Sequence, residues 1–372
     1  MLIGVPREIK TEEYRVGLIP ATVSELASRG HDIAVESGAG NGAGISDDEY
    51  AAAGARIYAT ADRIFEDAEL IVKVKEPLAF ERRKLRRGQM IFTYLHLAPD
   101  SEQANELLSS GVTAIAYETV TDPEGKLPLL APMSKVAGRM AIQVAAHFLE
   151  RPQGGRGILL GGIEGVAPAR VAILGGGVVG SSATEVATEM GADVTVITRS
   201  AGTIESLLRR FSGRIRALPA DSETIEAACA SADAVVGAAL VVGGATPKLI
   251  SKHTVANMKP GAVIVDVSID QGGCGETSRP TTHASPTYLV DGVMHYCVAN
   301  MPGAVPRTST FALNNATRPF VLALADKGFP QAFRDDVHLR NGLNIHDGKV
   351  TCLSVACALK LPYVPAMDVL VR

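Results

Sequence analysis

A glycine-rich segment, Gly175-Gly176-Gly177-Val178-Val179-Gly180, constrains the fold of this chain more than any other part of it. It follows an apolar stretch typical of a buried strand (171–174) and opens a helical pattern that runs to about residue 190. A second strand pattern (194–197) completes a strand–helix–strand unit. In such a unit Gly175 permits a tight turn, Gly177 lets the backbone approach a pyrophosphate, and Gly180 lets the helix pack closely on the strand. The segment therefore predicts a dinucleotide-binding domain.

The end of the second strand departs from the usual pattern of this unit. An Asp or Glu commonly stands about 20 residues after the glycines, where it binds the ribose 2′-hydroxyl of NAD. This chain has Thr198 at that position, followed by Arg199. A carboxylate would repel a 2′-phosphate, whereas an arginine attracts one. NAD is the expected cofactor, and use of NADP stays open.

Two series of alternating strand and helix patterns run along the chain. The first predicts strands at 33–36, 70–74, 90–94 and 112–116, with helices at 20–27 and 101–108. The second predicts strands at 171–174, 194–197, 234–237 and 262–266. A helix that begins with Ser134 as its N-cap and ends near Pro152 joins them, and from Thr308 onward we expect helices. The alternation predicts an α/β chain with two Rossmann-like domains and parallel sheets.

Charged side chains follow several of the predicted strands. Lys75 and His96 come after strands 70–74 and 90–94, and Asp270 comes after strand 262–266. Ligands of open α/β sheets bind beyond the carboxyl ends of the strands, so a cleft between two sheets would bring these residues and Arg15 together. Each residue taken singly also fits a structural role, as a solvated charge, a packed histidine or a turn residue. Spacing alone leaves both interpretations open.

Composition excludes several function classes. The net charge of −4 and the pI of about 6.1 do not favour binding to nucleic acid or to an anionic membrane. The five cysteines form no CxxC pair, so we expect no metal site, and scattered thiols fit a cytoplasmic location. No apolar run approaches the ~20 residues of a membrane span. The basic run 81–87 is interpreted as a solvated helix face or a partner contact, and the glycine-rich stretch 154–162 as a flexible loop or a loop that closes over a site.

Segments along nearly the whole chain resemble the alanine dehydrogenase family, whose relatives include transhydrogenase subunits, and they occur in the order typical of that family. They are Gly4-Val5-Pro6-Arg7-Glu8-Ile9-Lys10, Glu13-Tyr14-Arg15-Val16, Lys73-Val74-Lys75-Glu76-Pro77, Tyr94-Leu95-His96-Leu97-Ala98, Pro132-Met133-Ser134, 154–168, Asp266-Val267-Ser268-Ile269-Asp270-Gln271-Gly272-Gly273 and 298–306.

The resemblance implies an architecture and a set of site residues. It implies a homo-hexamer whose discontinuous substrate domain (1–128 and 307–372) carries an inserted dinucleotide domain (129–306). It implies that Arg15 and Lys75 bind the substrate carboxylate and carbonyl oxygen, and that His96 and Asp270 transfer protons. The implied dinucleotide pocket contains Ser134, Gly175, Gly177, Val179, Gly180, Leu240, Ile269, Asn300 and Met301. Thr198 lies where the family carries an acid for the adenosine ribose, so that one contact is not implied.

The resemblance implies reversible conversion of L-alanine, water and NAD⁺ to pyruvate, ammonium and NADH. Such a reaction needs groups that exchange protons near neutral pH, and a histidine or a desolvated aspartate meets that need. Three alternatives stay open: a dehydrogenase of another amino acid, a transhydrogenase-type subunit, and a dinucleotide-binding sensor without turnover. His96 and Asp270 argue against the last two, because neither would need proton-transfer residues.

Overall fold

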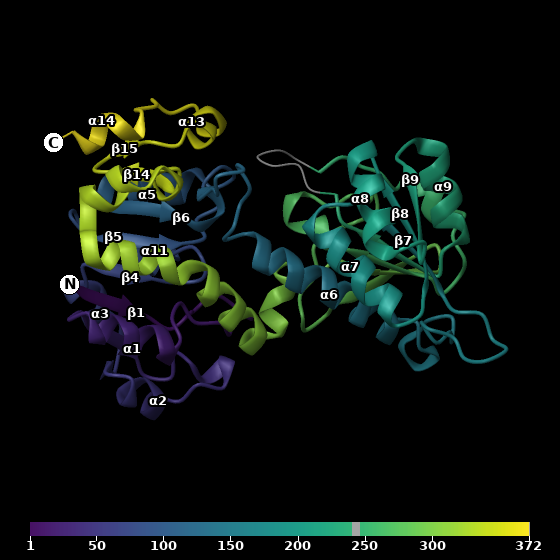
Figure 1. The fold of residues 1–372 in the computed structure, drawn as a ribbon, viewed down its shortest axis with the longest axis horizontal. Coiled ribbons are helices and arrows are strands. Elements are labelled where there is room, and N and C mark those ends of the chain that lie inside the picture. Colours follow the sequence, from purple (N-terminus) through teal and green to yellow (C-terminus); the bar gives the residue numbers. More distant parts are fainter. Residues whose placement is uncertain (240–245, 372) are drawn as a thin grey trace. The chain divides into compact units, whose positions relative to one another are not determined.

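The computed structural model describes residues 1–239 and 246–371, which fall into two compact units. The first unit comprises Met1–Met133 and Gly303–Arg372, and the second comprises Ser134–Pro302. Both chain ends lie in the first unit (Figure 1). The boundaries expected after residues 128 and 306 differ from these by a few residues. No helix in the described part of the chain is long and apolar enough to cross a membrane.

The first unit is built on an eight-stranded sheet in the order β15-β14-β6-β5-β4-β1-β2-β3. Its strands β1 to β6 are parallel and mostly buried, because helices cover both faces. The sheet contains β1 (Leu2–Val5), β2 (Asp32–Glu36), β3 (Arg56–Tyr58), β4 (Leu70–Val72), β5 (Met90–Thr93), β6 (Thr113–Ala116), β14 (Leu343–His346) and β15 (Lys349–Val350).

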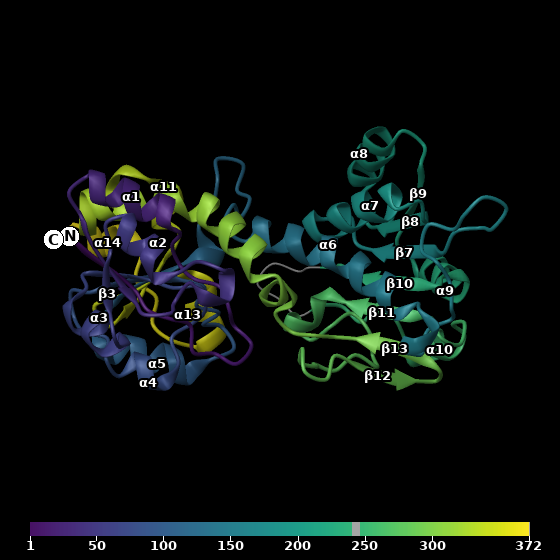
Figure 2. The same ribbon diagram turned by 90° about the horizontal axis from the view of Figure 1, so that it is seen from below.

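Helices α1 and α11 lie on one face of this sheet, and α3, α4 and α5 lie on the other (Figure 2). The second face buries a large apolar cluster that includes Ile64, Phe65, Ile91 and Leu107. The helices of this unit are α1 (Pro20–Ser28), α2 (Asp47–Ala52), α3 (Ala61–Asp67), α4 (Ala79–Arg82), α5 (Ser101–Ser110), α11 (Pro306–Asp335), α12 (Val337–Arg340), α13 (Leu353–Leu359) and α14 (Ala366–Leu370).

The expectation of helices from Thr308 onward is wrong for residues 343–350. These residues form the antiparallel strands β14 and β15, and β14 extends the sheet beside β6. Leu343 and Ile345 are buried, while Asp347 and Gly348 both have positive φ, as a two-residue hairpin turn requires. An Asp-Gly pair between short strands was therefore the local signal for this hairpin.

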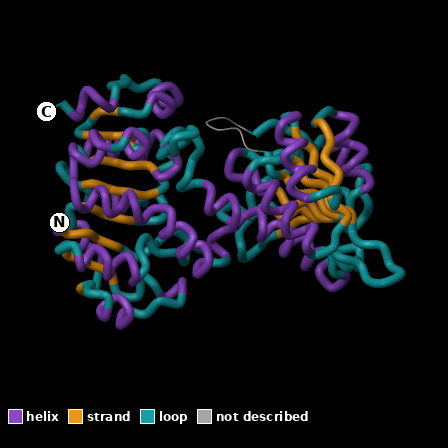
Figure 3. The backbone as a smooth tube through the Cα atoms, in the orientation of Figure 1, coloured by secondary structure: helices purple, strands orange, loops and turns teal. Residues whose placement is uncertain are grey.

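The second unit is built on a seven-stranded sheet in the order β12-β13-β11-β10-β7-β8-β9. All its strands except β12 run parallel, and strands alternate with helices from β7 to β11, which confirms the predicted fold class. Figure 3 shows the strands of this sheet in orange with helices packed around them. The strands are β7 (Arg170–Leu174), β8 (Asp193–Thr198), β9 (Ile215–Pro219), β10 (Ala234–Gly237), β11 (Val263–Asp266), β12 (Thr287–Val290) and β13 (Val293–Tyr296), and the helices are α7 (Val178–Glu189), α8 (Ala201–Phe211), α9 (Ser222–Ser231) and α10 (Lys252–Ala256).

Helix α6 (Ala131–Phe148) begins three residues before the expected N-cap. Ser134 lies inside its first turn, so the N-cap prediction is wrong. Pro132 is compatible with this earlier start, because a proline in the first helical turn removes an N–H that has no intrahelical partner. Further along, Gly138 lets α6 approach α7, since a Cβ there would lie 2.2 Å from the backbone oxygen of Val179.

Two of the glycines after β7 allow close approaches of the backbone. Gly175 has φ of 124°, and a Cβ there would lie 2.4 Å from the carbonyl oxygen of Ala238, which follows β10. A Cβ on Gly180 would lie 1.8 Å from the oxygen of Gly175. Gly177 differs, because a Cβ at that position meets no atom within 4 Å. Gly175 and Gly180 are therefore required by packing, whereas Gly177 leaves open space in front of the N-terminus of α7.

This difference predicts opposite results for two substitutions in one turn. Gly180→Ala forces the backbone apart, and overpacking of this kind costs about 1–3 kcal/mol. Gly177→Ser places a favoured N-cap residue in open space, so stability should stay within about 1 kcal/mol of the wild type. Thermal unfolding followed by circular dichroism measures both, and equal midpoints for the two variants would contradict the packing argument.

Candidate active site

The predicted substrate residues of the first unit lie where its strand order reverses. In the sheet, β1 is flanked by β2 on one side and by β4 on the other, so the chain connections diverge between β1 and β4. Open α/β sheets bind ligands beyond the carboxyl ends of the strands at such a point. Glu8 follows β1, Lys75 follows β4, and His96 follows β5 on the adjacent strand. The topology therefore places these three segments along one edge of the sheet.

A buried ion cluster fills the base of this edge. Lys73 is fully buried, and its Nζ lies 2.7 Å from Glu81 Oε1 and 3.1 Å from Glu8 Oε2. Burial alone would lower the pKa of Lys73, but the charges of Glu8 and Glu81 outweigh it and raise that pKa. Burial in turn raises the pKa of Glu8, with the charge of Lys73 acting in the opposite direction. The three side chains therefore form one buried ion cluster in which each depends on the others.

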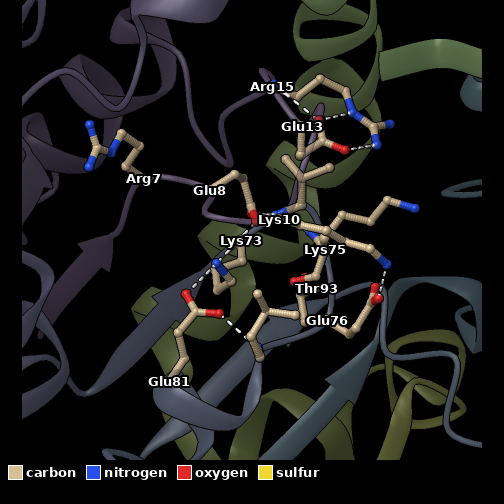
Figure 4. Close-up of polar contacts among 12 residues, drawn as sticks. Arg7, Glu8, Lys10, Glu13, Arg15, Lys73, Lys75, Glu76, Glu81 and Thr93 are labelled. Carbon is tan, nitrogen blue, oxygen red and sulfur yellow. Dashed lines mark hydrogen bonds and ion pairs between the residues drawn. The ribbon is translucent and has the colours of Figure 1, made fainter. Parts of the chain in front are cut away.

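The same cluster fixes the backbone that carries Lys75. Glu8 Oε1 accepts hydrogen bonds from the backbone N–H groups of Val74 (2.6 Å) and Lys75 (3.2 Å). Thr93 Oγ1 on the next strand donates to the carbonyl oxygen of Lys75 at 2.8 Å. Figure 4 shows the Lys75 side chain extending away from the Lys73–Glu81 pair. Glu8 and Thr93 thus fix the backbone of Lys75, whose side chain is half-buried.

Arg15 is paired side-on with Glu13, a partner that sequence reasoning missed. Its Nε lies 2.7 Å from Glu13 Oε1 and one terminal nitrogen lies 2.5 Å from Oε2, while both residues are buried (Figure 4). The other terminal nitrogen is 3.1 Å from the sulfur of Met133. Burial would lower the pKa of Arg15, but the hydrogen bonds and charge of Glu13 raise it. The guanidinium is therefore charged, and Glu13 occupies one of its edges.

His96 lies exposed after β5 in a backbone conformation uncommon for a residue with a Cβ, with φ of 50°. Glu118, which follows β6, accepts hydrogen bonds from the backbone N–H groups of His96 (2.6 Å) and Leu95 (3.2 Å). The imidazole stacks on Tyr94, with ring centroids 5.7 Å apart and planes at 7°. Glu118 and Tyr94 thus fix the position of His96, and neither had a local signal apart from its place at a strand end.

Asp270 lies exposed in the second unit, on a loop that a buried carboxylate organises. Asp266, at the end of β11, accepts hydrogen bonds from the backbone N–H groups of Ser268 (3.1 Å), Cys274 (2.8 Å) and Gly275 (3.2 Å). Lys248 donates to three carbonyl oxygens of the same loop. Asp266 is part of the segment 266–273 that resembles the family, but the sequence did not predict that its carboxylate orders this loop.

Most of the predicted dinucleotide residues of the second unit lie at or after the carboxyl ends of its strands, and the others lie on helices. Gly175 and Gly180 form the turn after β7, and Thr198 lies beside it, because its Cβ is 3.3 Å from where a Cβ on Gly176 would stand. Ile269 and Met301 are buried, whereas Asn300 is half-buried with positive φ. Leu240 lies outside the described residues. Ser134, at the start of α6, and Val179, in α7, are both half-buried.

The interpretation of 81–87 as a solvated helix face is wrong for its first residues. Glu81 is buried against Lys73, and it also accepts a hydrogen bond from the backbone N–H of Leu78 at 2.8 Å. Arg82 is buried as well and forms an ion pair with Glu106 of α5. The charged run itself gave no indication of these partners, because Lys73 and Glu106 lie 8 and 24 residues away from Glu81 and Arg82 in the sequence.

Lys73→Met should destabilise the first unit strongly. Removing one partner of a buried pair leaves uncompensated charge, which typically costs about 3–5 kcal/mol. The matched control is Lys84→Met, because Lys84 pairs with the largely exposed Asp62 and such pairs contribute about 1 kcal/mol or less. The chain contains no tryptophan, so urea unfolding is followed by circular dichroism. Similar losses in both variants would refute the role assigned to the buried cluster.

Comparisons with known proteins identify the family of this chain. Two family profiles match the chain: "Alanine dehydrogenase/PNT, N-terminal domain" over residues 4–137 and "Alanine dehydrogenase/PNT, C-terminal domain" over residues 141–353. Together they span both units, and they confirm the resemblance drawn from the sequence segments.

Full-length relatives support the same assignment. An alanine dehydrogenase of Halomonas elongata is 57% identical over 370 residues and one of Mycobacterium tuberculosis is 50% identical over 370 residues, each alignment covering 100% of both chains. A solved L-alanine dehydrogenase matches with a TM-score of 0.94 and 48% identity, covering 97% of this chain and 99% of that one. A transhydrogenase from Sinorhizobium meliloti, at 24% identity and a TM-score of 0.81, shares the fold. The chain belongs to the alanine dehydrogenase/PNT family.

Proposed function

We propose that this chain catalyses the reversible oxidative deamination of L-alanine, in which L-alanine, water and NAD⁺ give pyruvate, ammonium, NADH and a proton. The observation that carries the proposal is the 57% identity, over the whole of both chains, to a relative named alanine dehydrogenase. The likeness to a transhydrogenase is one of fold and does not favour that alternative. A homo-hexamer remains a prediction that the mass of the purified protein in solution would test.

The direct test is a substrate panel with purified protein. L-alanine should support reduction of the dinucleotide, and pyruvate with ammonium should support the reverse reaction. Glycine, L-serine, L-valine and L-glutamate probe how far the side chain can vary. A higher kcat/KM for another amino acid than for L-alanine would overturn the assignment of substrate.

The residues after β7 fit the pyrophosphate of a dinucleotide. Gly177 leaves open space in front of α7, and the first N–H groups of a helix have no intrahelical partner and attract negative charge. A side chain there would fill the space that such a ligand needs. When bound, the nicotinamide ring accepts the hydride from Cα of the amino acid.

Arg15 and Lys75 are the proposed substrate-binding residues. Because Glu13 engages the edge of Arg15 formed by Nε and one terminal nitrogen, a carboxylate would meet the side of the other terminal nitrogen. Lys75, held by Glu8 and Thr93 through its backbone, would place its ammonium against the carbonyl oxygen of pyruvate. A fixed cation there would stabilise negative charge that develops on this oxygen.

His96 and Asp270 are the proposed proton-transfer groups. Deamination requires removal of protons from the substrate ammonium and from the attacking water, and the reverse reaction returns them. Both side chains are exposed on their own units, so each can exchange protons with solvent between turnovers. The rigid supports of His96, namely Glu118 and Tyr94, suit a general acid–base group, whose action depends on position.

Loss of either group should lower turnover. His96→Ala and Asp270→Asn should each reduce kcat by about 10²–10⁴-fold, the usual contribution of a general acid–base residue. His253→Ala, at an exposed histidine on α10, serves as the control and should leave kcat unchanged. Turnover near the wild-type level in either test variant would remove that residue from the mechanism.

Arg15→Lys should weaken substrate binding. A lysine carries all its donors on one nitrogen, so it cannot bind Glu13 along one edge and the substrate along another as the planar guanidinium does. Loss of one charge-assisted contact corresponds to about 1.5–3 kcal/mol, so KM for pyruvate should rise by about 10–100-fold while KM for the dinucleotide changes little. Arg7→Lys, an exposed neighbour, is the control. An equal rise in both KM values would instead indicate general disruption.

A further inference from the structure

The end of β8 lacks the charge that usually selects against a phosphate. In doubly wound folds the residue that ends the second strand faces the 2′-position of the adenosine ribose. Here that residue is Thr198, which is half-buried and lies beside Gly176 of the glycine-rich turn. A threonine hydroxyl can hydrogen-bond a ribose hydroxyl, but it does not repel an anion.

A pocket suited to an anion opens directly beside this position. Its lining residues contain no carboxylate, and Arg210 is their charged member. It is continuous with the glycine-rich turn, because a Cβ on Gly176 would lie 2.6 Å from Thr203 Cγ2. Ser200 Oγ accepts a hydrogen bond from the backbone N–H of Thr203 at 3.2 Å, which leaves its own proton available as a donor. The polar lining residues are Ser181, Ser200, Thr203, Ser206 and Arg210.

The charged lining residue of this pocket shares its carboxylate partner with a second arginine. Arg210 pairs with Glu185 Oε2 at 3.2 Å, but Arg139 uses the same oxygen at 3.1 Å, so one carboxylate serves two guanidinium groups. Arg199 is exposed, and among the described residues it forms no ion pair. A phosphate at this place would therefore meet arginines that are only partly neutralised.

We infer that the pocket lined by Ser200, Thr203 and Arg210, beside Thr198, binds the 2′-phosphate of NADP(H), with Arg199 as a further cation, so that the chain accepts NADP(H) as well as NAD(H). The inference rests on the proposed function, which it deepens by naming a second dinucleotide. The hydride step is unchanged, since the 2′-phosphate lies on the adenosine half of the molecule and takes no part in it. NAD⁺ binding persists, because Thr198 keeps a hydroxyl for the ribose.

Kinetics with L-alanine and both dinucleotides form the first part of the test. The wild type should show a kcat/KM for NADP⁺ within about tenfold of that for NAD⁺. Thr198→Asp should lower kcat/KM for NADP⁺ by about 10–100-fold, the effect of one charged contact, and should raise or preserve that for NAD⁺. Thr198→Val removes the hydroxyl without adding charge and should retain NADP⁺ use. Strict NAD⁺ use by the wild type, unaltered by Thr198→Asp, would overturn the inference.

Calorimetry forms the second part and does not depend on turnover. Adenosine 2′,5′-bisphosphate should bind the wild type at least tenfold more tightly than adenosine 5′-monophosphate. Arg199→Gln and Arg210→Gln should each reduce that preference, whereas Arg209→Gln, exposed on the same helix but outside the pocket lining, should not. Equal affinity for the two nucleotides would overturn the inference. Failure of L-alanine oxidation with both dinucleotides, with the preference for the bisphosphate intact, would instead overturn only the proposed function.

Discussion

The ion cluster formed by the buried Lys73 ammonium with Glu8 and Glu81 is the interaction that positions the segments after β1 and β4, including Lys75. An unpaired charge in a protein interior costs several kcal/mol, so the three side chains can be buried only together. Glu8 lies after β1 and Lys73 after β4, which means that the ion pair joins the two strands at which the chain order reverses. The second oxygen of Glu8 then binds the backbone of Val74 and Lys75. The same glutamate that neutralises Lys73 therefore also fixes the backbone position of Lys75.

The six parallel strands of the second unit have the same order as those of the first, but the segments after its central strands are positioned mainly by backbone atoms. Gly175 brings the segment after β7 to within contact of Ala238 after β10, an approach that any side chain would prevent. Asp266 then orders the next loop by accepting three backbone hydrogen bonds. The difference follows from the ligand chemistry proposed for each unit. A pyrophosphate is bound best by backbone N–H groups, whereas a small carboxylate and carbonyl require cationic side chains.

The parts of this structure that were predictable from sequence are those that depend on local pattern. Apolar strand runs, the alternation with helices and the glycine turn are each contained within a few residues, and the fold class follows from them. Family resemblance supplied Arg15, Lys75, His96 and Asp270, which spacing alone left open. The supports of these residues were missed, because Glu8 and Lys73 are 65 residues apart and Glu118 lies 22 residues from His96. Side-chain pairing over such separations produces no periodic pattern in the sequence. The hairpin 343–350 was missed because its strands, of four and two residues, are too short to show a period.

Family membership predicts a dinucleotide-binding turn in this chain, but it does not predict whether the dinucleotide is NAD or NADP. The glycine turn and Thr198 illustrate the physical reason for this difference. The turn proposed to bind the pyrophosphate depends on backbone geometry, and two of its glycines, Gly175 and Gly180, cannot change without loss of packing, as the 1.8 Å approach at Gly180 demonstrates. Thr198 ends β8 and Arg199 follows it, and the backbone pairing of β8 with β9 at this point does not depend on which side chain is present. Substitution there alters charge and not fold. On the proposed assignment of the site, pyrophosphate binding and discrimination at the ribose 2′-position can therefore vary independently within one fold, because backbone geometry governs the first and side-chain charge governs the second.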